Sequence, residues 1–421
     1  MPPVLANVLR AFTTHVHAAR SDFSSVKSQW RNPNDILSIL TIIGGDIVQR
    51  AVAQLSGSPY YITPVAFSFG WVGYALNMVL GIMGEGRLMP DPDCECVLVN
   101  AKSQYMKTNR SWILGRLVRD HDKMKEKERL SKKISKPPPL SIWFYRTSTE
   151  QKQGVPATDW IYWTGLFVIF AQLGIAIIPG AVDQDWTILT VTIIGTVLSL
   201  IGGALPKWKE EKWNGRKSTK DSDRTVICLT KGNGYPDVMV IISEGKDQFR
   251  LEDIANARDK PVEWTLTIAL MLCIAQIILL LIVAGLNNHA WFLLAIGALG
   301  IVQNAVAAGY CRDLHTTGIH LEPINEKGTK GLVSHDKKVM EALMAAEKEE
   351  PYVGLSLLQV FFPGDRLRMS EKKWRDDLLE KYEDEDRRQE VEKTQQPKSG
   401  SSNPNISIAR NSHVSESLVN T

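Results

Sequence analysis

The chain has 421 residues, of which 44% are hydrophobic and 23% charged, and its formal net charge is +3. A charge this small gives no indication of nucleic acid as a partner. The apolar residues are gathered in long blocks instead of recurring at the period of an amphipathic helix or strand. This distribution favours a protein that crosses a membrane several times.

Residues 1–35 precede the first apolar block, and we expect them to form a cytosolic N-terminal tail. They lack an apolar core long enough for a cleavable signal. Their basic residues and single early acid, Asp22, also fit a mitochondrial presequence, but an ordinary cytosolic tail explains them equally well.

Six apolar blocks follow, and they predict an all-α membrane fold of six transmembrane helices. Five of the blocks carry no charge and exceed about 18 residues, enough to cross roughly 30 Å of hydrocarbon as a helix. The sixth, residues 36–55, is apolar except for Asp46 and Arg50. Short connections pair the blocks into three predicted hairpins, at residues 36–84, 160–206 and 264–310.

The second and third hairpins follow one template. Trp160 is followed twelve residues later by Gln172, and Trp264 twelve residues later by Gln276. The first hairpin is a diverged copy, because a proline and an acid precede its first span as they do in the other two. We therefore predict three parallel two-helix units that form an internal repeat.

The basic residues indicate which segments face the cytosol. All 49 except Arg50 fall in residues 1–35, 85–159, 207–263 and 311–421. Because basic residues stay on the cytosolic side of a membrane, we expect these segments and both termini to be cytosolic. An alternative makes residues 36–55 a re-entrant segment, which leaves five spans and an N-terminus outside. The choice between an endomembrane and the plasma membrane stays open.

The cytosolic segments carry small extensions. In residues 85–159, Ser111 can cap a helix whose apolar start and basic continuation are typical of a helix on an anionic membrane surface, ended by the prolines at 137–139. In residues 207–263, TVICLT and VMVIIS flank KGNGYPD and predict a β-hairpin, since KGNG lacks the spacing of a phosphate loop. Residues 311–392 predict a helical tail, and the composition of residues 393–421 is typical of disorder.

No catalytic, cofactor or metal site is predicted. The sequence lacks an HExxH motif, a paired histidine box, a Walker loop and an Asp-rich diphosphate motif, which disfavours an enzyme. Cys94 and Cys96, near Asp91, Asp93 and Glu95, could form a thiolate and carboxylate metal site. An isolated CxC pair is more often a pair of surface thiols.

Polar side chains inside the predicted spans are the candidate functional site. Asp46 and Arg50 lie one helical turn apart, and the cost of placing charges near the helix centre indicates that they face protein. Other spans also carry a polar residue near mid-depth: Asn77, Gln172, Thr196, Gln276, Gln303 and Asn304. These residues could line a substrate or proton path, with Gln172 and Gln276 facing each other. They could instead form interhelical hydrogen bonds, and we favour that interpretation.

Four sequence segments carry a family resemblance. RNPNDILSILTIIGGDIVQRAVAQL, ITPVAFSFGWVGYA, SWILGRLVRD and VGLSLLQVFFPGD together resemble a group of uncharacterised polytopic integral membrane proteins of filamentous fungi, over most of the chain up to about Arg368. The resemblance implies a membrane location and brings no catalytic residues. Three units of this length also invite comparison with mitochondrial carriers. The P-x-[DE]-x-x-[KR] motif of that family is absent after Gly45, Gln172 and Gln276, so we reject the match.

Two function classes follow from the sequence. The first is a transporter-like or small-molecule-binding protein, with the lipid bilayer and a lipophilic small molecule as its partners. The alternative is a membrane-bound accessory or tailoring factor, an enzyme or a scaffold, in fungal specialised metabolism. Movement of a solute in reconstituted vesicles would favour the first class, and a changed metabolite profile without such movement the second. The sequence does not indicate an oligomeric state.

Overall fold

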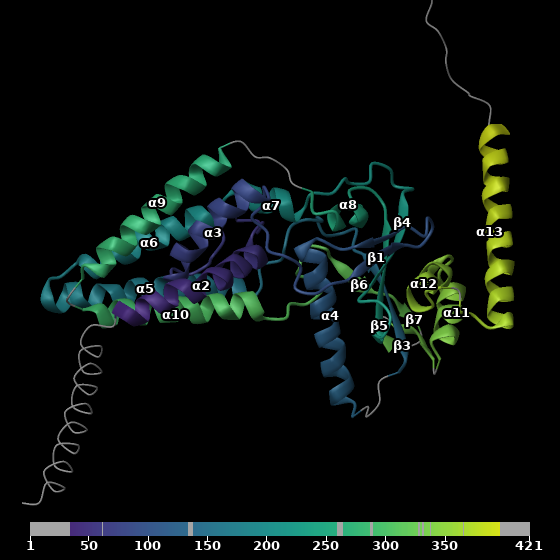
Figure 1. Ribbon diagram of the computed structural model, residues 1–421, viewed down its shortest axis with the longest axis horizontal. Coiled ribbons are helices and arrows are strands. Elements are labelled where there is room, and N and C mark those ends of the chain that lie inside the picture. The colour runs from purple at the N-terminus through teal and green to yellow at the C-terminus, as the bar shows by residue number, and fades with distance from the viewer. Residues whose placement is uncertain are drawn as a thin grey trace, which may run out of the picture. The chain divides into compact units, whose positions relative to one another are not determined.

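The computed structural model describes residues 34–60, 62–133, 138–258, 264–286, 289–326, 329–330, 332–336, 338–364 and 366–395 (Figure 1). They belong to two units, one up to Asp365 and one from Arg366 onward. The second unit contains the charged helix α13 (Met369–Gln395), as the sequence predicts. The predictions of a cytosolic N-terminal tail and of a disordered C-terminal tail concern mainly residues 1–33 and 396–421, which lie outside the described residues.

Helices form one part of the first unit. They are α2 (Asn34–Leu55), α3 (Gly70–Gly84), α5 (Trp160–Asp183), α6 (Thr187–Gly203), α9 (Thr265–Ala284) and α10 (Ala290–Gly309). Four are long and apolar enough to cross a membrane: α5, α6 together with the short α7 (Pro206–Lys212), α9 and α10. Large apolar side chains point outward from them, including Phe167 and Phe170 on α5 and Met271 and Leu281 on α9. Such surfaces suit lipid rather than water.

Exposed tryptophans mark both ends of these four helices. Trp160 and Trp264 stand at the starts of α5 and α9, and Trp186 and Trp291 at the connections to α6 and α10. Tryptophan is enriched at the two membrane–water interfaces. The positions therefore match a helical layer that spans a bilayer.

The first pair of helices differs from the other two, and six spans are not confirmed. α3 has only 15 residues and is joined to α2 by a long connection that is mostly non-helical. Lys212, which follows α6, donates to the carbonyl oxygens of Ala53, Gln54 and Ser56 at 2.8, 3.2 and 3.2 Å. The C-terminal end of α2 therefore lies beside the segment that follows the C-terminal end of α6. The α5–α6 connection is at the other end of α6.

A β-sheet forms the other part of the first unit. Its strands are β1 (Val97–Asn100), β2 (Met106–Thr108), β3 (Leu140–Thr147), β4 (Arg224–Thr230), β5 (Asp237–Glu244), β6 (Leu321–Pro323) and β9 (Leu332–Asp336). The order is β2-β1-β4-β5-β3-β6, with β9 also paired to β3, and β3 runs parallel to β5. A separate ribbon joins β7 (Asn325–Glu326) and β8 (Thr329–Lys330).

The sheet extends the sequence prediction. The predicted hairpin is confirmed, because β4 and β5 pair antiparallel with Thr230 opposite Val238. The remaining strands of the sheet come from two other segments expected in the cytosol, residues 85–159 and 311–421, and they join the hairpin in one sheet. The fold is therefore mostly helical with a sheet, rather than all-α with one hairpin.

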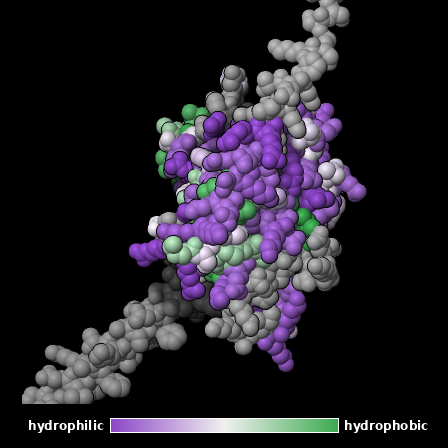
Figure 2. Space-filling model, turned by 90° about the vertical axis from the view of Figure 1, so that its right-hand side faces the viewer, coloured by the Kyte–Doolittle hydropathy of each residue, from purple (hydrophilic) through white to green (hydrophobic). Residues whose placement is uncertain are grey.

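Short helices cover the sheet. They are α4 (Trp112–Ser131), α8 (Leu251–Ala255), α11 (Val339–Glu349) and α12 (Val353–Phe361). The apolar side chains of α4, such as Leu114 and Leu117, are buried in the same core as residues of β1, β4 and β5. The sheet thus supplies the apolar partner for α4. We predicted that the apolar face of this helix contacts a lipid surface, but that face is buried against the sheet. Seen from the side of the sheet, the surface is mostly hydrophilic (Figure 2).

Candidate functional site

A non-helical segment, residues 62–69, lies inside the helical bundle. Gln172 Nε2 donates to the carbonyl oxygens of Phe67 and Ile296 at 2.7 and 2.8 Å. Asn304 accepts from the backbone N–H of Ala66 at 3.1 Å and donates to its carbonyl oxygen at 3.0 Å. Unpaired backbone groups are costly in an apolar interior, so these two amides make the segment's position possible.

Glycines on the surrounding helices make room for this segment. A Cβ atom at Gly300 on α10 would overlap the carbonyl oxygen of Phe67, and one at Gly165 on α5 would overlap that of Pro64. A Cβ at Gly195 on α6 would overlap the Phe67 ring. Three helices therefore carry a glycine at the point where the segment passes, which allows close approach of backbone and ring.

The remaining predicted polar residues do not join Gln172 and Asn304 in one site. Gln303 donates to the Thr164 hydroxyl at 3.2 Å, and Asn77 is exposed. The Thr196 hydroxyl and the Gln276 carbonyl oxygen are buried without a hydrogen-bond partner. Gln172 is bonded to backbone rather than to Gln276, so the structure does not show the two amides facing each other across a cavity.

Asp46 and Arg50 form an ion pair, but away from the amides. Arg50 Nε lies 3.0 Å from Asp46, and its Nη1 lies 2.9 Å from Asp93. The Asp46 side chain is 65% exposed, whereas Asp93 is 3% exposed. The partner that fixes Arg50 is therefore Asp93, a residue of the sheet-side loop that follows α3.

Asp93 belongs to a buried charge cluster that joins the bundle to the sheet. Arg116 and Arg119 on α4 lie 2.7 and 3.1 Å from Asp93, and Arg119 lies 2.6 Å from Asp120. Arg116 also donates to the carbonyl oxygens of Ala308 and Tyr310, at 2.7 Å each, where α10 ends. Asp93, Arg116, Arg119 and Asp120 are hereafter the junction cluster. Sequence reasoning missed it, although an Arg and an Asp one turn apart among apolar residues of α4 was a usable signal.

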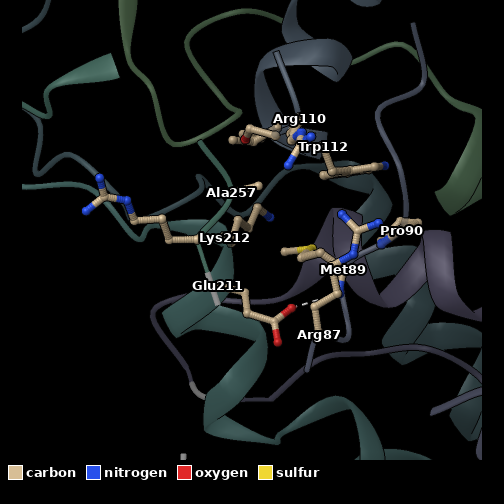
Figure 3. Close-up of a pocket in the computed structure, with 11 residues that line it drawn as sticks. Arg87, Met89, Pro90, Arg110, Trp112, Glu211, Lys212 and Ala257 are labelled. Atoms are coloured by element: carbon tan, nitrogen blue, oxygen red, sulfur yellow. Dashed lines mark hydrogen bonds between the residues drawn. The ribbon is translucent and has the colours of Figure 1, made fainter. Parts of the chain in front are cut away.

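A cleft opens beside the junction cluster. Its outer part has a volume of about 670 Å³, and an inner recess of about 20 Å³ shares Arg87, Arg110 and Ala257 with it (Figure 3). Arg87 is paired with Glu85 and Asp91 at 2.6 and 2.7 Å. Arg110 and Arg258 also line the recess, and their guanidinium groups form no ion pair or hydrogen bond with any residue that the structure describes.

The start of α4 brings backbone N–H groups to the wall of the recess. α4 begins there with Trp112, its first turn carries no acid, and Ser111 makes no capping hydrogen bond. The Trp112 indole N–H is buried without a partner. The carboxylate of Glu211 is already engaged by the backbone N–H groups of Leu88 and Met89, at 2.8 and 2.9 Å. The N-terminal end of a helix with an arginine beside it attracts anions.

The two cysteines of the CxC pair are not surface thiols. Cys96 is buried, and the partly buried Cys94 donates its thiol to the carbonyl oxygen of Gly115 at 3.1 Å. Within the described ranges, no three His, Cys, Asp or Glu side chains are placed to hold a metal ion.

Comparison with models of known protein families, with curated proteins and with solved structures finds no match for this chain. The resemblance to fungal membrane proteins therefore stays a prediction. What the site can do has to be argued from its own geometry.

Proposed function

We propose that this protein is an integral membrane protein that binds a small molecule carrying a phosphate or carboxylate group in the cleft at the helix–sheet junction. One observation carries the proposal: the Arg110 guanidinium, at the start of α4 between the recess and the outer cleft, has no ion-pair or hydrogen-bond partner among the described residues. Arginine recognises such oxyanions through paired N–H donors.

The outer cleft suggests the rest of the ligand. Its volume lies within the range of small-molecule sites. Its wall also carries Glu85, Asp91 and Glu95, with Thr108 and Asn109. These side chains favour hydroxyl or amino groups on the part of the ligand that faces away from Arg110, so the ligand is polar rather than lipophilic.

The distribution of basic residues supports a cytosolic position for the cleft. The segments that line it are among those that hold nearly all the lysines and arginines, and such segments are favoured on the cytosolic side. Binding there is compatible with an accessory role in metabolism, in which the helices anchor the sheet at a membrane.

The geometry favours binding at this cleft over transport along the mid-depth amides. Gln172 and Asn304 hydrogen-bond to backbone groups of residues 62–69. Hydrogen bonds of this kind make the two amides packing contacts, which favours a structural role for them over coordination of a moving solute.

The test is equilibrium binding to the full-length protein in detergent. We expect inorganic phosphate and a sugar phosphate to bind, and Arg110→Met to weaken binding at least about tenfold, or about 1.4 kcal/mol. Lys127→Met, which removes an exposed charge of α4 outside the cleft, is the matched control and should leave binding unchanged. A short-chain phosphatidic acid tests whether a lipid headgroup is preferred over soluble phosphates. Absence of binding by all three probes, or equal affinity of Arg110→Met, would contradict the proposal.

A further inference from the structure

We infer that residues 62–84 form a re-entrant segment, so that the chain crosses the membrane five times and residue 34 lies on the side opposite the sheet. The inference is independent of ligand binding in the cleft. It rests on where the connection between α2 and α3 enters the bundle, how deep it goes and where it leaves.

The segment enters from the sheet side. The Thr63 hydroxyl donates to the carbonyl oxygen of Gly203, the last residue of α6, at 2.8 Å. Tyr60 packs near Tyr162, at the start of α5, with ring centroids 6.0 Å apart. The end of α6 and the start of α5 are both on the side that leads into the sheet, so the α2–α3 connection lies on that side too.

The segment then reaches the middle of the bundle. Along α5 its contacts move from Gly165 to Gln172, and along α6 from Gly203 to Gly195. At 1.5 Å per residue these steps correspond to about 10–12 Å of depth. A non-helical backbone at such a depth is tolerated where protein groups satisfy it, as Gln172 and Asn304 do here.

α3 returns to the side from which the segment came. Gly70 packs against Gly44 in α2, Trp71 lies against Gly202 near the end of α6, and Tyr74 stacks near Trp208 of α7, at 6.1 Å. The residues after α3 then line the sheet-side cleft. α3 therefore does not cross the bundle.

α2 runs parallel to α10 and starts at the far end. Gly44 lies near Ile301, and ten residues later the carbonyl oxygen of Gln54 lies 3.4 Å from Arg312, just beyond α10. α10 runs from the α9–α10 connection toward the sheet, so α2 does the same (Figure 1). With 22 residues α2 is about 33 Å long, enough to cross the hydrocarbon layer.

Whether the number of crossings is odd or even decides whether the two ends of the chain lie on the same side of the membrane, and this can be tested. Five crossings, by α2, α5, α6, α9 and α10, place the two ends of the chain on opposite sides, whereas four or six place them on the same side. We expect protease added to sealed vesicles of one orientation to remove only one of two epitope tags, one fused before Met1 and one after Thr421. Removal or protection of both tags would overturn the inference.

A second measurement does not depend on the tags. An impermeant thiol reagent should label Tyr60→Cys when it is added on the side of the membrane on which the sheet lies. Tyr60 is exposed beside the start of α5, which is on that side. Asp185→Cys, in the α5–α6 connection, is the matched control and should be labelled from the other side. Labels read peptide by peptide separate these sites from the five native cysteines. Labelling of both sites from one side would contradict the five-crossing arrangement.

Discussion

At the residue scale, two glutamines in equivalent sequence positions have different surroundings. Gln172 and Gln276 each stand twelve residues after a tryptophan, which correctly indicated a buried amide in each helix. Only Gln172 meets residues 62–69, and its bond to Phe67 spans 105 residues of chain. No local sequence pattern predicts a contact between residues so far apart in the chain. The difference between the helices that carry Gln172 and Gln276 therefore could not be predicted from the sequence.

This difference predicts unequal effects of the same substitution. Gln172→Leu should lower the thermal stability of the purified protein, because it leaves the carbonyl oxygens of Phe67 and Ile296 buried without these donors. The cost of such a group is about 1–3 kcal/mol. Gln276→Leu is the control and should change stability much less, since the hydrogen bonds to the backbone of residues 62–69 come from Gln172 and Asn304 rather than from Gln276. Equal loss in both variants, measured by heating in detergent, would show that the contacts around residues 62–69 do not matter.

His121 on α4 gives a prediction about pH. Burial is the largest cause that lowers the pKa of His121, whose ring packs edge-on against Trp143 and Tyr145 with centroids 6.0 and 5.7 Å away. Its Nδ1 lies 3.5 Å from Asp122, too far for a strong hydrogen bond. As pH falls below about 6.5, the unfolded chain binds a proton at this residue that the folded protein does not, so stability decreases.

The expected loss is at most about 1.4 kcal/mol per pH unit, until the folded pKa is reached. His121→Phe keeps an aromatic ring at this position and removes the titrating group. We therefore expect unfolding temperatures measured between pH 7.5 and 5 to fall less steeply in the variant than in the wild type. Parallel curves would mean that His121 is protonated in the folded protein as easily as in the unfolded chain.

At the element scale, the sequence predicted where helix α4 begins, but not that the helix packs on a sheet. Its apolar start and basic continuation fit a helix on a membrane surface equally well as a helix packed on a sheet. The strands that cover it, β3 and β5, pair with each other across more than 90 residues of sequence. The junction cluster is the polar counterpart of this packing, and it ties α4 to the ends of α2 and α10 through Arg50, Asp93 and Arg116.

Arg116 should be the most sensitive residue of the cluster. Arg116→Leu leaves Asp93 without its closest partner and removes both bonds to the end of α10, and breaking a buried ion pair costs about 3–5 kcal/mol. Arg146→Leu is the control, because its side chain is 57% exposed and 3.8 Å from Glu244, where a pair contributes at most about 1 kcal/mol. The amount of folded protein extracted from membranes compares the two. Similar yields would contradict the role given to the junction cluster.

At the scale of the whole molecule, the apolar blocks predicted the helices well, but not the path between the first two. Charge-free blocks of sufficient length identified α5, α6, α9 and α10 directly. The block at 64–84 was equally apolar, yet its first residues are not helical and only Gly70–Gly84 forms a helix. Hydropathy reports that a segment is buried in an apolar layer. It does not report whether the segment crosses that layer or turns back within it.

Polar side chains of α5 and α10, Gln172 and Asn304, hold residues 62–69 inside the bundle. Hydrogen–deuterium exchange of the purified protein tests it most directly, at the backbone amide of Ala66, which donates to Asn304. We expect exchange at Ala66 to be as slow as in the middle of α5, and to become faster in Asn304→Leu. The neighbouring variant Gln303→Leu, which loses only a bond to Thr164, should leave it slow. Exchange in the wild type as fast as in the exposed β4–β5 turn would contradict the account.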